Sequence, residues 1–391
     1  MKKTAEIIFE PGQEYSIERQ KWMGCPSIER TGKRTWIAWF TGGKFEPCIY
    51  NYAVVSHWDD GEPIRREPYL AIVCHPEDGQ RICDSQLWLD PNGRLWLYWM
   101  QDFFLPGTPP SDYDTPGEEL FAHFFQRQQV WAMYTDDPES DHPTWSDPFY
   151  LADGYLRNRP IALRDGTILM PAYNFHRYDR YCYFASKDAG MTVTVKEGPV
   201  KTERVSFDEP IFVEYEDGSL HFFARTTTGY IAESSSLDGG ETWTPTVSTK
   251  HPNPCTRFYI GRLKNGMLLL VNTPSSTMGD RTGLVASLSE DDGKTWPYSL
   301  VLDDRRSTTY PDVAQGEDGR LYIIYDCQRD NRQEPCEDDD TKSNAAKEIC
   351  LAVITVEDIM KGKLDDSNSV LRSVVYRSNY NDRVIGQDVG R

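Results

Sequence analysis

Short apolar runs that turn at a glycine and then return recur along the whole chain. Six of these runs occupy residues 26–28, 85–87, 160–163, 210–213, 258–260 and 311–314. In five of the six, Asp or Asn precedes the turn glycine, as in Asp165-Gly166 and Asp217-Gly218. Apolar runs bounded in this way are typical of short β-strands joined by tight turns. The pattern therefore predicts six β-hairpins spread over the chain.

One phrase of eight residues occurs twice almost unchanged, as SLDGGETW at 236–243 and SEDDGKTW at 289–296. Looser copies lie at 186–193, 135–145 and 56–61. Short Asp and Ser side chains bond nearby backbone amides, glycine supplies positive φ, and Trp packs into a neighbouring unit, so the phrase encodes a closed turn. Repetition about every 50 residues indicates a propeller or a solenoid.

These repeats predict an all-β, six-bladed β-propeller. Length alone would suggest two or three domains, but blades of about 50 to 70 residues add up to one closed ring. We expect a single domain over 1–391, with blades at roughly 20–78, 79–152, 153–202, 203–250, 251–303 and 304–378. Closure removes exposed strand edges, so a strand from 4–10 or 370–376 is expected to pair with another blade.

Charge and cysteine content narrow the class of protein. The net charge of −19 argues against nucleic-acid and anionic membrane partners. Acidic residues after Met1 replace the apolar run of a signal peptide, which predicts a cytoplasmic protein as written, or a periplasmic or secreted one if a signal was removed. Nine cysteines without a C-x-x-C motif predict reduced, buried thiols and no metal site, and no cofactor is expected.

The inner strands of a propeller surround its central axis, so the residues at their starts should converge on one mouth of the channel. These residues are Cys25, Asp84, Arg159, Glu209, Arg257 and Tyr310. The alternative interpretation is that polar residues only line a water-filled channel. Two acids, two arginines and a tyrosine favour a site, because a solvated channel needs no such convergence.

Loops between the second and third strands should lie on the same face as these strand starts. Glu46 lies in that loop of the first blade, Arg225 follows Phe222-Phe223-Ala224 in the fourth, and Arg281 precedes an apolar strand in the fifth. We therefore add all three to the candidate site.

With these motifs the chain resembles the sialidase (neuraminidase) superfamily of six-bladed propellers with Asp-box repeats, from about residue 22 to 326. The resemblance implies that Glu209 activates Tyr310, which attacks the anomeric carbon, and that Arg225 and Arg281 bind the carboxylate of the sugar. Sialic acid carries a carboxylate on its anomeric carbon. A neutral phenol avoids the repulsion that a carboxylate nucleophile would meet there.

The sequence departs from the family at two places. Cys25 stands where the family has the first arginine of its carboxylate clamp, and Arg159 or Arg257 is expected to replace that contact. The family's acid is an aspartate in the first-blade loop. Here Glu46 is the expected general acid and Asp84 the second choice.

The sequence thus predicts a glycoside hydrolase that removes a terminal, acidic sugar from a glycan. Two alternatives remain open. One is a hydrolase or lyase for a different sugar, such as a uronic acid or a deoxysugar, which the missing arginine favours. The other is a non-catalytic glycan-binding propeller. The expected partner is a glycan or a small sugar in all three cases.

Overall fold

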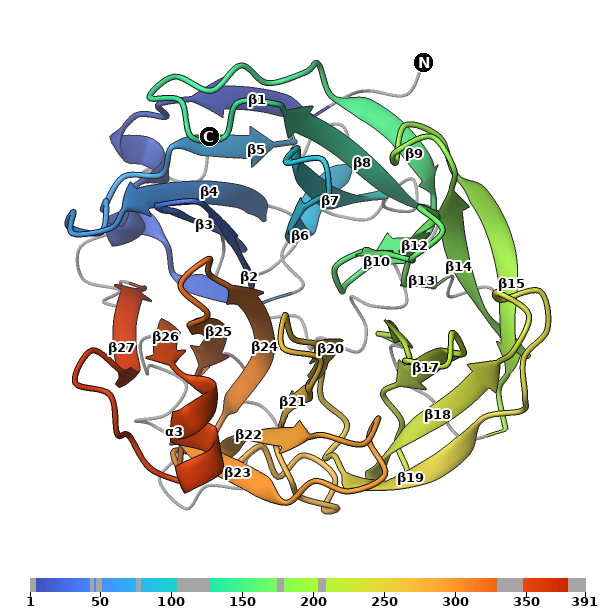
Figure 1. Cartoon of the computed structure of the whole chain (residues 1–391). Helices are drawn as coiled ribbons and strands as arrows, with labels where there is room; N and C mark the ends of the chain where they lie inside the picture. Colours follow the sequence, from blue (N-terminus) through green and yellow to red (C-terminus); the bar gives the residue numbers. More distant parts are fainter. Residues whose placement is uncertain are drawn as a thin grey trace.

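The computed structural model describes residues 5–42, 46, 51–74, 79–103, 127–173, 179–202, 209–328 and 347–378. Within these residues, six antiparallel sheets of four or five strands follow one another around a common centre, as the colour sequence in Figure 1 shows. The protein is a six-bladed β-propeller, as the sequence repeats predicted.

The strands of each blade follow chain order from the centre outward. From the first blade to the sixth they are β2 (Trp22–Thr31), β3 (Arg34–Gly42), β4 (Tyr52–Asp59) and β5 (Leu70–Val73); β6 (Gln80–Leu89), β7 (Leu95–Phe103), β8 (Arg127–Thr135) and β9 (Phe149–Asp153); β11 (Ile161–Ala162), β12 (Ile168–Met170), β14 (Arg180–Ser186) and β15 (Thr194–Val200); β16 (Ile211–Glu214), β17 (Leu220–Ala224), β18 (Tyr230–Ser236) and β19 (Val247–Pro252); β20 (Tyr259–Arg262), β21 (Leu268–Asn272), β22 (Leu284–Ser289) and β23 (Tyr298–Asp303); β24 (Thr308–Gln315), β25 (Leu321–Cys327), β26 (Glu348–Ile354) and β27 (Val370–Arg377).

A few elements stand outside this scheme. β1 (Glu6–Phe9) adds a fifth strand to the outer edge of the first blade, and β10 (Tyr155–Leu156) pairs with β13 (Ala172–Tyr173). Two short 3₁₀ helices lie at Gln13–Tyr15 and Ile17–Arg19. The helix α3 (Val356–Lys361) begins at Thr355, whose side chain accepts a hydrogen bond from the Asp358 backbone amide.

The repeated turns form the hydrogen bonds that their sequence predicts. Asp238 accepts from the Thr242 amide at 2.9 Å and from the Thr242 hydroxyl at 2.5 Å, while Ser236 Oγ accepts from the Gly240 amide at 2.9 Å. Gly240 has φ of +92°, and a Cβ there would lie 2.6 Å from the Tyr183 hydroxyl of the neighbouring blade. Glycine is therefore required by conformation and by space.

The tryptophans of these turns, Trp243 and Trp296, are half-buried, whereas the sequence predicted that they would be largely buried between blades. Trp243 packs against Phe212 and Phe222 of its own blade and against Tyr183 of the third blade, with ring centroids about 6 Å apart. The aromatic contacts nevertheless join the two blades.

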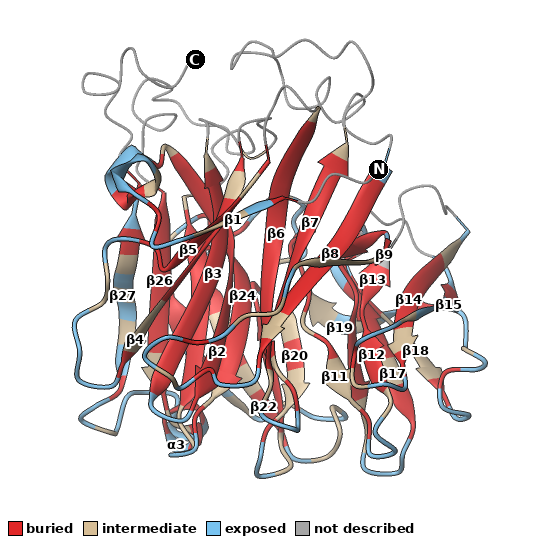
Figure 2. Cartoon of the chain, turned by 90° about the horizontal axis from the view of Figure 1, so that it is seen from above, coloured by how far each residue is buried: buried red, intermediate tan, exposed pale blue. Residues whose placement is uncertain are grey.

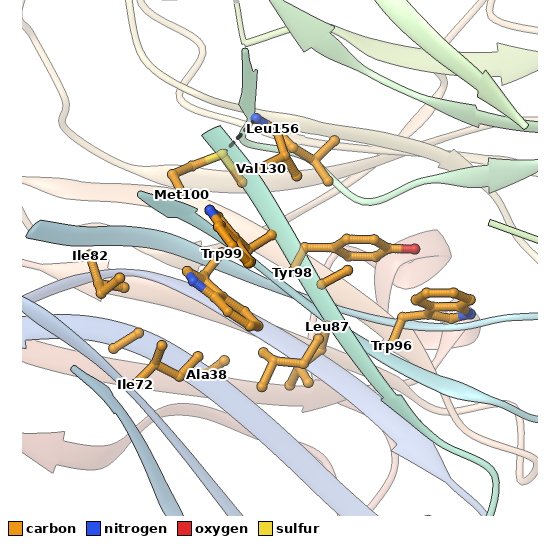
Figure 3. Close-up of a cluster of buried hydrophobic side chains, with 14 of the residues drawn as sticks. Ala38, Ile72, Ile82, Leu87, Trp96, Tyr98, Trp99, Met100, Val130 and Leu156 are labelled. Atoms are coloured by element: carbon orange, nitrogen blue, oxygen red, sulfur yellow. Dashed lines mark hydrogen bonds between the residues drawn. The ribbon is translucent and has the colours of Figure 1, made fainter. Parts of the chain in front are cut away.

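Aromatic and aliphatic side chains fill the space between the first and second blades. Trp96, Tyr98 and Trp99 of β7 are fully buried, Trp96 against Gly190 of the third blade. Figure 3 shows Trp99 in one cluster with Ala38 and Ile72 of the first blade and Ile82 and Leu87 of the second. Figure 2 shows that the inner strands are buried, whereas outer strands such as β15 and β27 are partly exposed. The hydrophobic contacts of this layer fix the relative positions of the two blades.

The ring closes without the strand exchange that the sequence suggested. β1 pairs with β5 and β27 pairs with β26, so both strands stay in the blades nearest to them in sequence. Side chains join the last blade to the first. Asp312 Oδ2 accepts from Ser27 Oγ at 2.7 Å and from the Ile28 amide at 3.0 Å.

The centre of the ring is crossed by a buried ionic cluster. Arg159 of the third blade donates to Asp312 at 3.1 Å and forms an ion pair with Glu29 at 3.2 Å. Glu29 also accepts from the Leu89 amide of the second blade at 3.0 Å. These contacts join four blades across the axis, so charged side chains occupy this level of the propeller.

The seven described cysteines are all buried and form no disulfide, which agrees with the predicted reduced thiols. Within the described part of the chain, no helix has the length and apolarity needed to cross a bilayer.

Candidate active site

Four inner strands are preceded or interrupted by one residue in a left-handed backbone conformation. The φ values are +50° at Cys25, +42° at Asp84, +41° at Glu209 and +54° at Tyr310. At three of the four the strand pairing shifts register, which marks a β-bulge. Bulges redirect side chains, and non-glycine residues with such φ values cost on the order of 1–3 kcal/mol each and cluster at functional sites.

Two of these residues contact each other directly. The Tyr310 hydroxyl donates to Glu209 Oε1 at 2.7 Å. Glu209 is fully buried and Tyr310 is 2% exposed. A phenol and a carboxylate in this geometry have the arrangement of a nucleophile and its base.

Two arginines bind the carboxylate of Glu209. Arg225 Nη1 donates to Glu209 Oε2 at 2.9 Å and to the Tyr310 hydroxyl oxygen at 3.1 Å, and Arg157 Nη1 donates to Glu209 Oε1 at 3.2 Å. Burial raises the pKa of Glu209, but the two guanidinium groups and the Tyr310 hydroxyl outweigh it and lower the pKa to about 2. Glu209 is therefore ionised at neutral pH and accepts the phenolic hydrogen bond as a carboxylate.

Asp84 joins this cluster from the second blade. Its carboxylate is fully buried and forms an ion pair with Arg157 Nε at 2.8 Å. Burial raises the pKa of Asp84, Arg157 opposes that change, and the charge of Glu46 adds to it. Glu46 is only half-buried, and its backbone carbonyl accepts from Arg81 at 2.9 Å and also from Asn51. The structure thus brings the two candidate acids near each other.

Arg225 and Arg281 meet at Cys255. Arg225 Nε donates to Cys255 Sγ at 3.3 Å, and Arg281 Nη2 donates to the Cys255 carbonyl at 3.3 Å. The carbonyl of Arg281 also accepts from the amide of Thr308, two residues before Tyr310. The two arginines predicted to bind a carboxylate therefore lie side by side next to the tyrosine.

The expectation that Arg159 or Arg257 binds substrate stays a prediction, and both side chains have partners within the protein. Arg159 is held by Asp312 and Glu29 in the axial cluster. Arg257 donates to the backbone carbonyls of Arg157, at 2.9 Å, and Tyr310, at 3.0 Å, and its guanidinium lies 5.0 Å from the Tyr310 ring centroid. Arg257 therefore supports the site from behind the tyrosine.

Arg157 is the site residue that the sequence did not reveal. The proline at 160 marks a strand start, so alignment with the other blades placed Arg159 at the mouth. In the third blade, however, the separate strand β10 precedes the inner strand, and Arg157 follows β10 directly. The apolar pair Tyr155-Leu156 after a glycine was the available signal for this extra strand.

Cys25 lies at the bulge of the first inner strand and is fully buried. Its amide donates to Asp326 Oδ2 at 2.8 Å.

The described cluster has four guanidinium groups, on Arg157, Arg225, Arg257 and Arg281, and three carboxylates, on Asp84, Glu209 and Glu46. Within the described residues, no group of three or more His, Cys, Asp or Glu side chains could hold a metal ion. Because it has four guanidinium groups and three carboxylates, the cluster carries an excess of positive charge in a protein of net charge −19.

A six-bladed propeller with a buried tyrosine, glutamate and arginine cluster at the inner strand ends defines a sialidase-like fold. The BNR repeat-like domain family matches residues 116–323, more than half of the chain, so the chain belongs to that family.

Two curated relatives share part of this sequence. The anhydrosialidase of Macrobdella decora is 28% identical over 178 residues, which are 41% of this chain and 23% of the relative. The sialidase of Micromonospora viridifaciens is 28% identical over 248 residues, which are 56% of this chain and 35% of the relative. The matches thus span about a quarter to a third of the length of these relatives.

Solved structures share the fold over most of the chain. A leech intramolecular trans-sialidase complexed with 2,7-anhydro-Neu5Ac superimposes with a TM-score of 0.66 and 14% identity, covering 92% of this chain and 71% of that one. The intramolecular trans-sialidase of Ruminococcus gnavus gives 0.64 and 14%, covering 91% and 98%. The Hadza microbial sialidase Hz136 gives 0.60 and 20%, covering 82% and 66%. At these identities the similarity establishes the fold.

Proposed function

We propose that the protein is a glycoside hydrolase of sialidase-like type that removes a terminal, acidic sugar from a glycan, with Tyr310 as nucleophile and Glu209 as its base. The observation that carries this proposal is the 2.7 Å hydrogen bond from the buried Tyr310 hydroxyl to Glu209. The sialidase relatives and the shared fold support the same class of reaction.

In the first step the phenolic proton moves to Glu209 as the Tyr310 oxygen attacks the anomeric carbon. The glycosidic bond breaks, and a general acid protonates the departing oxygen, so the sugar is left attached to the tyrosine. In the second step a water or another hydroxyl attacks the anomeric carbon. The proton of that water or hydroxyl passes to the general acid that was deprotonated in the first step, and the Tyr310 oxygen leaves and takes back its proton from Glu209. Arg225, at 3.1 Å from the phenolic oxygen, stabilises the negative charge that develops there.

Glu46 is the proposed general acid. It is half-buried, whereas Asp84 is fully buried and ion-paired with Arg157. A general acid must reach the glycosidic oxygen, which favours the more accessible carboxyl. Asp84 remains the second choice because burial raises its pKa.

The acidic character of the sugar follows from the arginines. Arg225 and Arg281 lie together at Cys255 and can bind a carboxylate with charge-assisted hydrogen bonds. Cys25 replaces a third arginine, which weakens carboxylate binding by about 1.5–3 kcal/mol relative to a complete clamp. That weaker clamp favours a second candidate function, action on a different sugar such as a uronic acid. A purely glycan-binding propeller would not need the Tyr310–Glu209 pair.

A panel of aryl glycosides tests the proposal. It should include an α-sialoside, a glucuronide and neutral deoxysugar glycosides, assayed with the wild-type protein and with Tyr310→Phe. We expect release of the phenol from the α-sialoside by the wild type alone. Turnover of the glucuronide or of a deoxysugar glycoside in place of the α-sialoside would move the assignment to the second candidate, and no turnover with retained glycan binding would favour a binding protein.

The mass of the released sugar separates two outcomes of the second step. Attack by water gives the free sugar, whereas attack by a hydroxyl of the sugar itself gives a product lighter by one water. Two of the similar solved structures are intramolecular trans-sialidases, which makes this measurement part of the first assay.

A further inference from the structure

Arg157 bridges two buried carboxylates from different blades. Its Nε forms an ion pair with Asp84 of the second blade at 2.8 Å, and its Nη1 donates to Glu209, at the start of the fourth blade, at 3.2 Å. Arg157 itself belongs to the third blade and is only 4% exposed. A planar guanidinium with several donors in a fixed arrangement suits this bridging role better than a flexible ammonium group.

The segment around Arg157 is anchored on every side. Figure 3 shows the Leu156 amide bonded to Met100 Sδ of the second blade, at 3.0 Å. Asn158 Nδ2 donates to the carbonyls of Glu209 at 3.0 Å and Pro210 at 2.8 Å. The segment therefore fixes both the backbone and the side chain of Glu209.

Tyr155 provides a platform beneath the guanidinium. The Arg157 guanidinium carbon lies 4.9 Å from the centroid of the Tyr155 ring, and the Tyr155 hydroxyl donates to Asp102 at 2.6 Å. Asp102 in turn forms an ion pair with Arg81 at 2.8 Å, and Arg81 holds the backbone of Glu46. A continuous set of buried contacts thus links Arg157 to the candidate acid as well.

We propose that Arg157 is a positioning residue, which ties Asp84 to Glu209 and turns Oε1 of Glu209 toward the Tyr310 hydroxyl. The inference rests on the proposed function, because it assigns Arg157 a role in activating Tyr310.

The two oxygens of Glu209 show how this positioning operates. Oε1 receives both Arg157 and Tyr310, while Oε2 receives Arg225. Without Arg157, the carboxylate can rotate to place both oxygens on Arg225 in a bidentate pair. That rotation would remove the acceptor from the phenol, so fewer molecules would hold the pair in the reactive geometry.

The charged and titratable groups around Glu209 in the described part of the chain enter the expected pH dependence. Arg157 faces it from the segment after β10, Arg225 from the end of β17, Tyr310 from β24 and Asp84 from β6. Arg257 lies behind the tyrosine ring. Removing Arg157 leaves Arg225 as the remaining guanidinium on the Glu209 carboxylate, so the pKa of Glu209 should rise.

The test compares Arg157→Met and Arg157→Lys with the wild type in full pH profiles of kcat and kcat/KM. For Arg157→Met we expect kcat to fall about 10- to 100-fold with KM nearly unchanged, and the acid limb of kcat/KM to move up by about 1–3 pH units. Arg157→Lys keeps the charge and should move the limb less, although one ammonium group cannot reproduce both contacts. If Arg157→Met does not fold, the Lys variant carries the test.

Arg159→Met is the matched control, because Arg159 lies two residues away and is ion-paired with two buried carboxylates, Glu29 and Asp312, rather than with Glu209. It should lower thermal stability and leave the acid limb in place. If Arg157→Met, or the Lys variant in its place, lowers only stability as Arg159→Met does, the positioning role is wrong. Tyr310→Phe in the same assays separates the two proposals. If Tyr310→Phe is active, the proposed function is wrong. If Tyr310→Phe is inactive but the Arg157 variants keep the acid limb of the wild type, only this inference is wrong.

Discussion

The Tyr310 hydroxyl lies 2.7 Å from Oε1 of Glu209, although 101 positions separate the two residues in the sequence. Both residues adopt positive φ at the start of an inner strand. This conformation costs on the order of 1–3 kcal/mol at each position and directs both side chains toward one point. The propeller thus brings together a phenol and a carboxylate that no local sequence pattern connects.

Tyr310→Phe removes the phenolic oxygen and keeps the ring. We expect kcat to fall by about a thousandfold or more with KM nearly unchanged, because the ring still packs while the nucleophile is gone. Steady-state kinetics on the acidic glycoside, with a melting curve to confirm folding, make the measurement. Full activity in this variant would remove tyrosine catalysis and direct attention to Asp84 and Glu46 as a carboxylate pair.

Glu209→Gln should reduce both turnover and stability. An amide cannot take the phenolic proton, and the variant leaves Arg157 and Arg225 without the charge that they bind. The pKa of Glu209 falls from 4.5 to about 2 on folding, a shift that stabilises the native state by on the order of 3 kcal/mol above pH 4.5.

The sign of this shift fixes the pH dependence. A carboxyl whose pKa is lower in the folded state stabilises that state at pH values above its pKa in the unfolded state. This stabilisation is lost as the pH falls through its pKa in the folded state. The difference in free energy of unfolding between wild type and Glu209→Gln should therefore be largest above about pH 4.5 and shrink toward pH 2. Urea unfolding at several pH values measures it, and a constant difference across that window would contradict the assignment.

Arg281→Ala tests carboxylate recognition. We expect the dissociation constant for an acidic sugar to rise roughly 10- to 100-fold, since one charge-assisted contact is lost. The methyl ester of the same sugar is the matched ligand, because it has the same shape without the charge. Titration calorimetry with both ligands distinguishes the cases: equal weakening for acid and ester would show that Arg281 acts through packing.

Asp238→Ala should lower the melting temperature and leave kcat unchanged. Asp238 holds its turn through Thr242 and Ser236, at the end of β18. The register of the fourth blade pairs Ser236 with Leu220 and Ala232 with Ala224, which places Asp238 at the end of the sheet away from Arg225. Leu237→Ala, at an adjacent exposed position, is the control and should melt like the wild type. Lost activity with unchanged melting would assign the turn to the site.

Local patterns made much of this molecule predictable from its sequence. The glycine turns and the repeated Asp-box phrase depend on hydrogen bonds within a few residues, so their sequence signal is direct. Glu209 and Tyr310 could be found because each directly precedes a proline at a strand start. For these two residues, the place in the repeat pattern of the sequence is also the place at the start of an inner strand in the structure.

Long-range contacts were the part that the sequence could not predict. Arg159 and Arg257 have the same residue type as Arg225, and only their partners separate them: carboxylates across the axis for Arg159 and backbone carbonyls for Arg257. The role of Arg157 depends on the extra strand β10, which displaces the alignment by two residues. Ring closure through Asp312 likewise involves side chains nearly 300 positions apart.

The identity of the general acid can be read from its dependence on the leaving group. A departing alkoxide needs a proton, whereas an acidic phenol departs without one, so loss of the acid should matter only for the former. We expect Glu46→Gln to slow release from a natural glycan by about 100- to 1,000-fold and to have a much smaller effect on a nitrophenyl glycoside. Asp84→Asn should slow the release of sugar from both substrates by the same factor, because Asp84 acts through its ion pair with Arg157. The ratio of the two rates for each variant is the measurement. If Asp84→Asn shows the leaving-group dependence and Glu46→Gln does not, the acid is Asp84, and the half-buried Glu46 serves only to raise the pKa of that buried carboxyl.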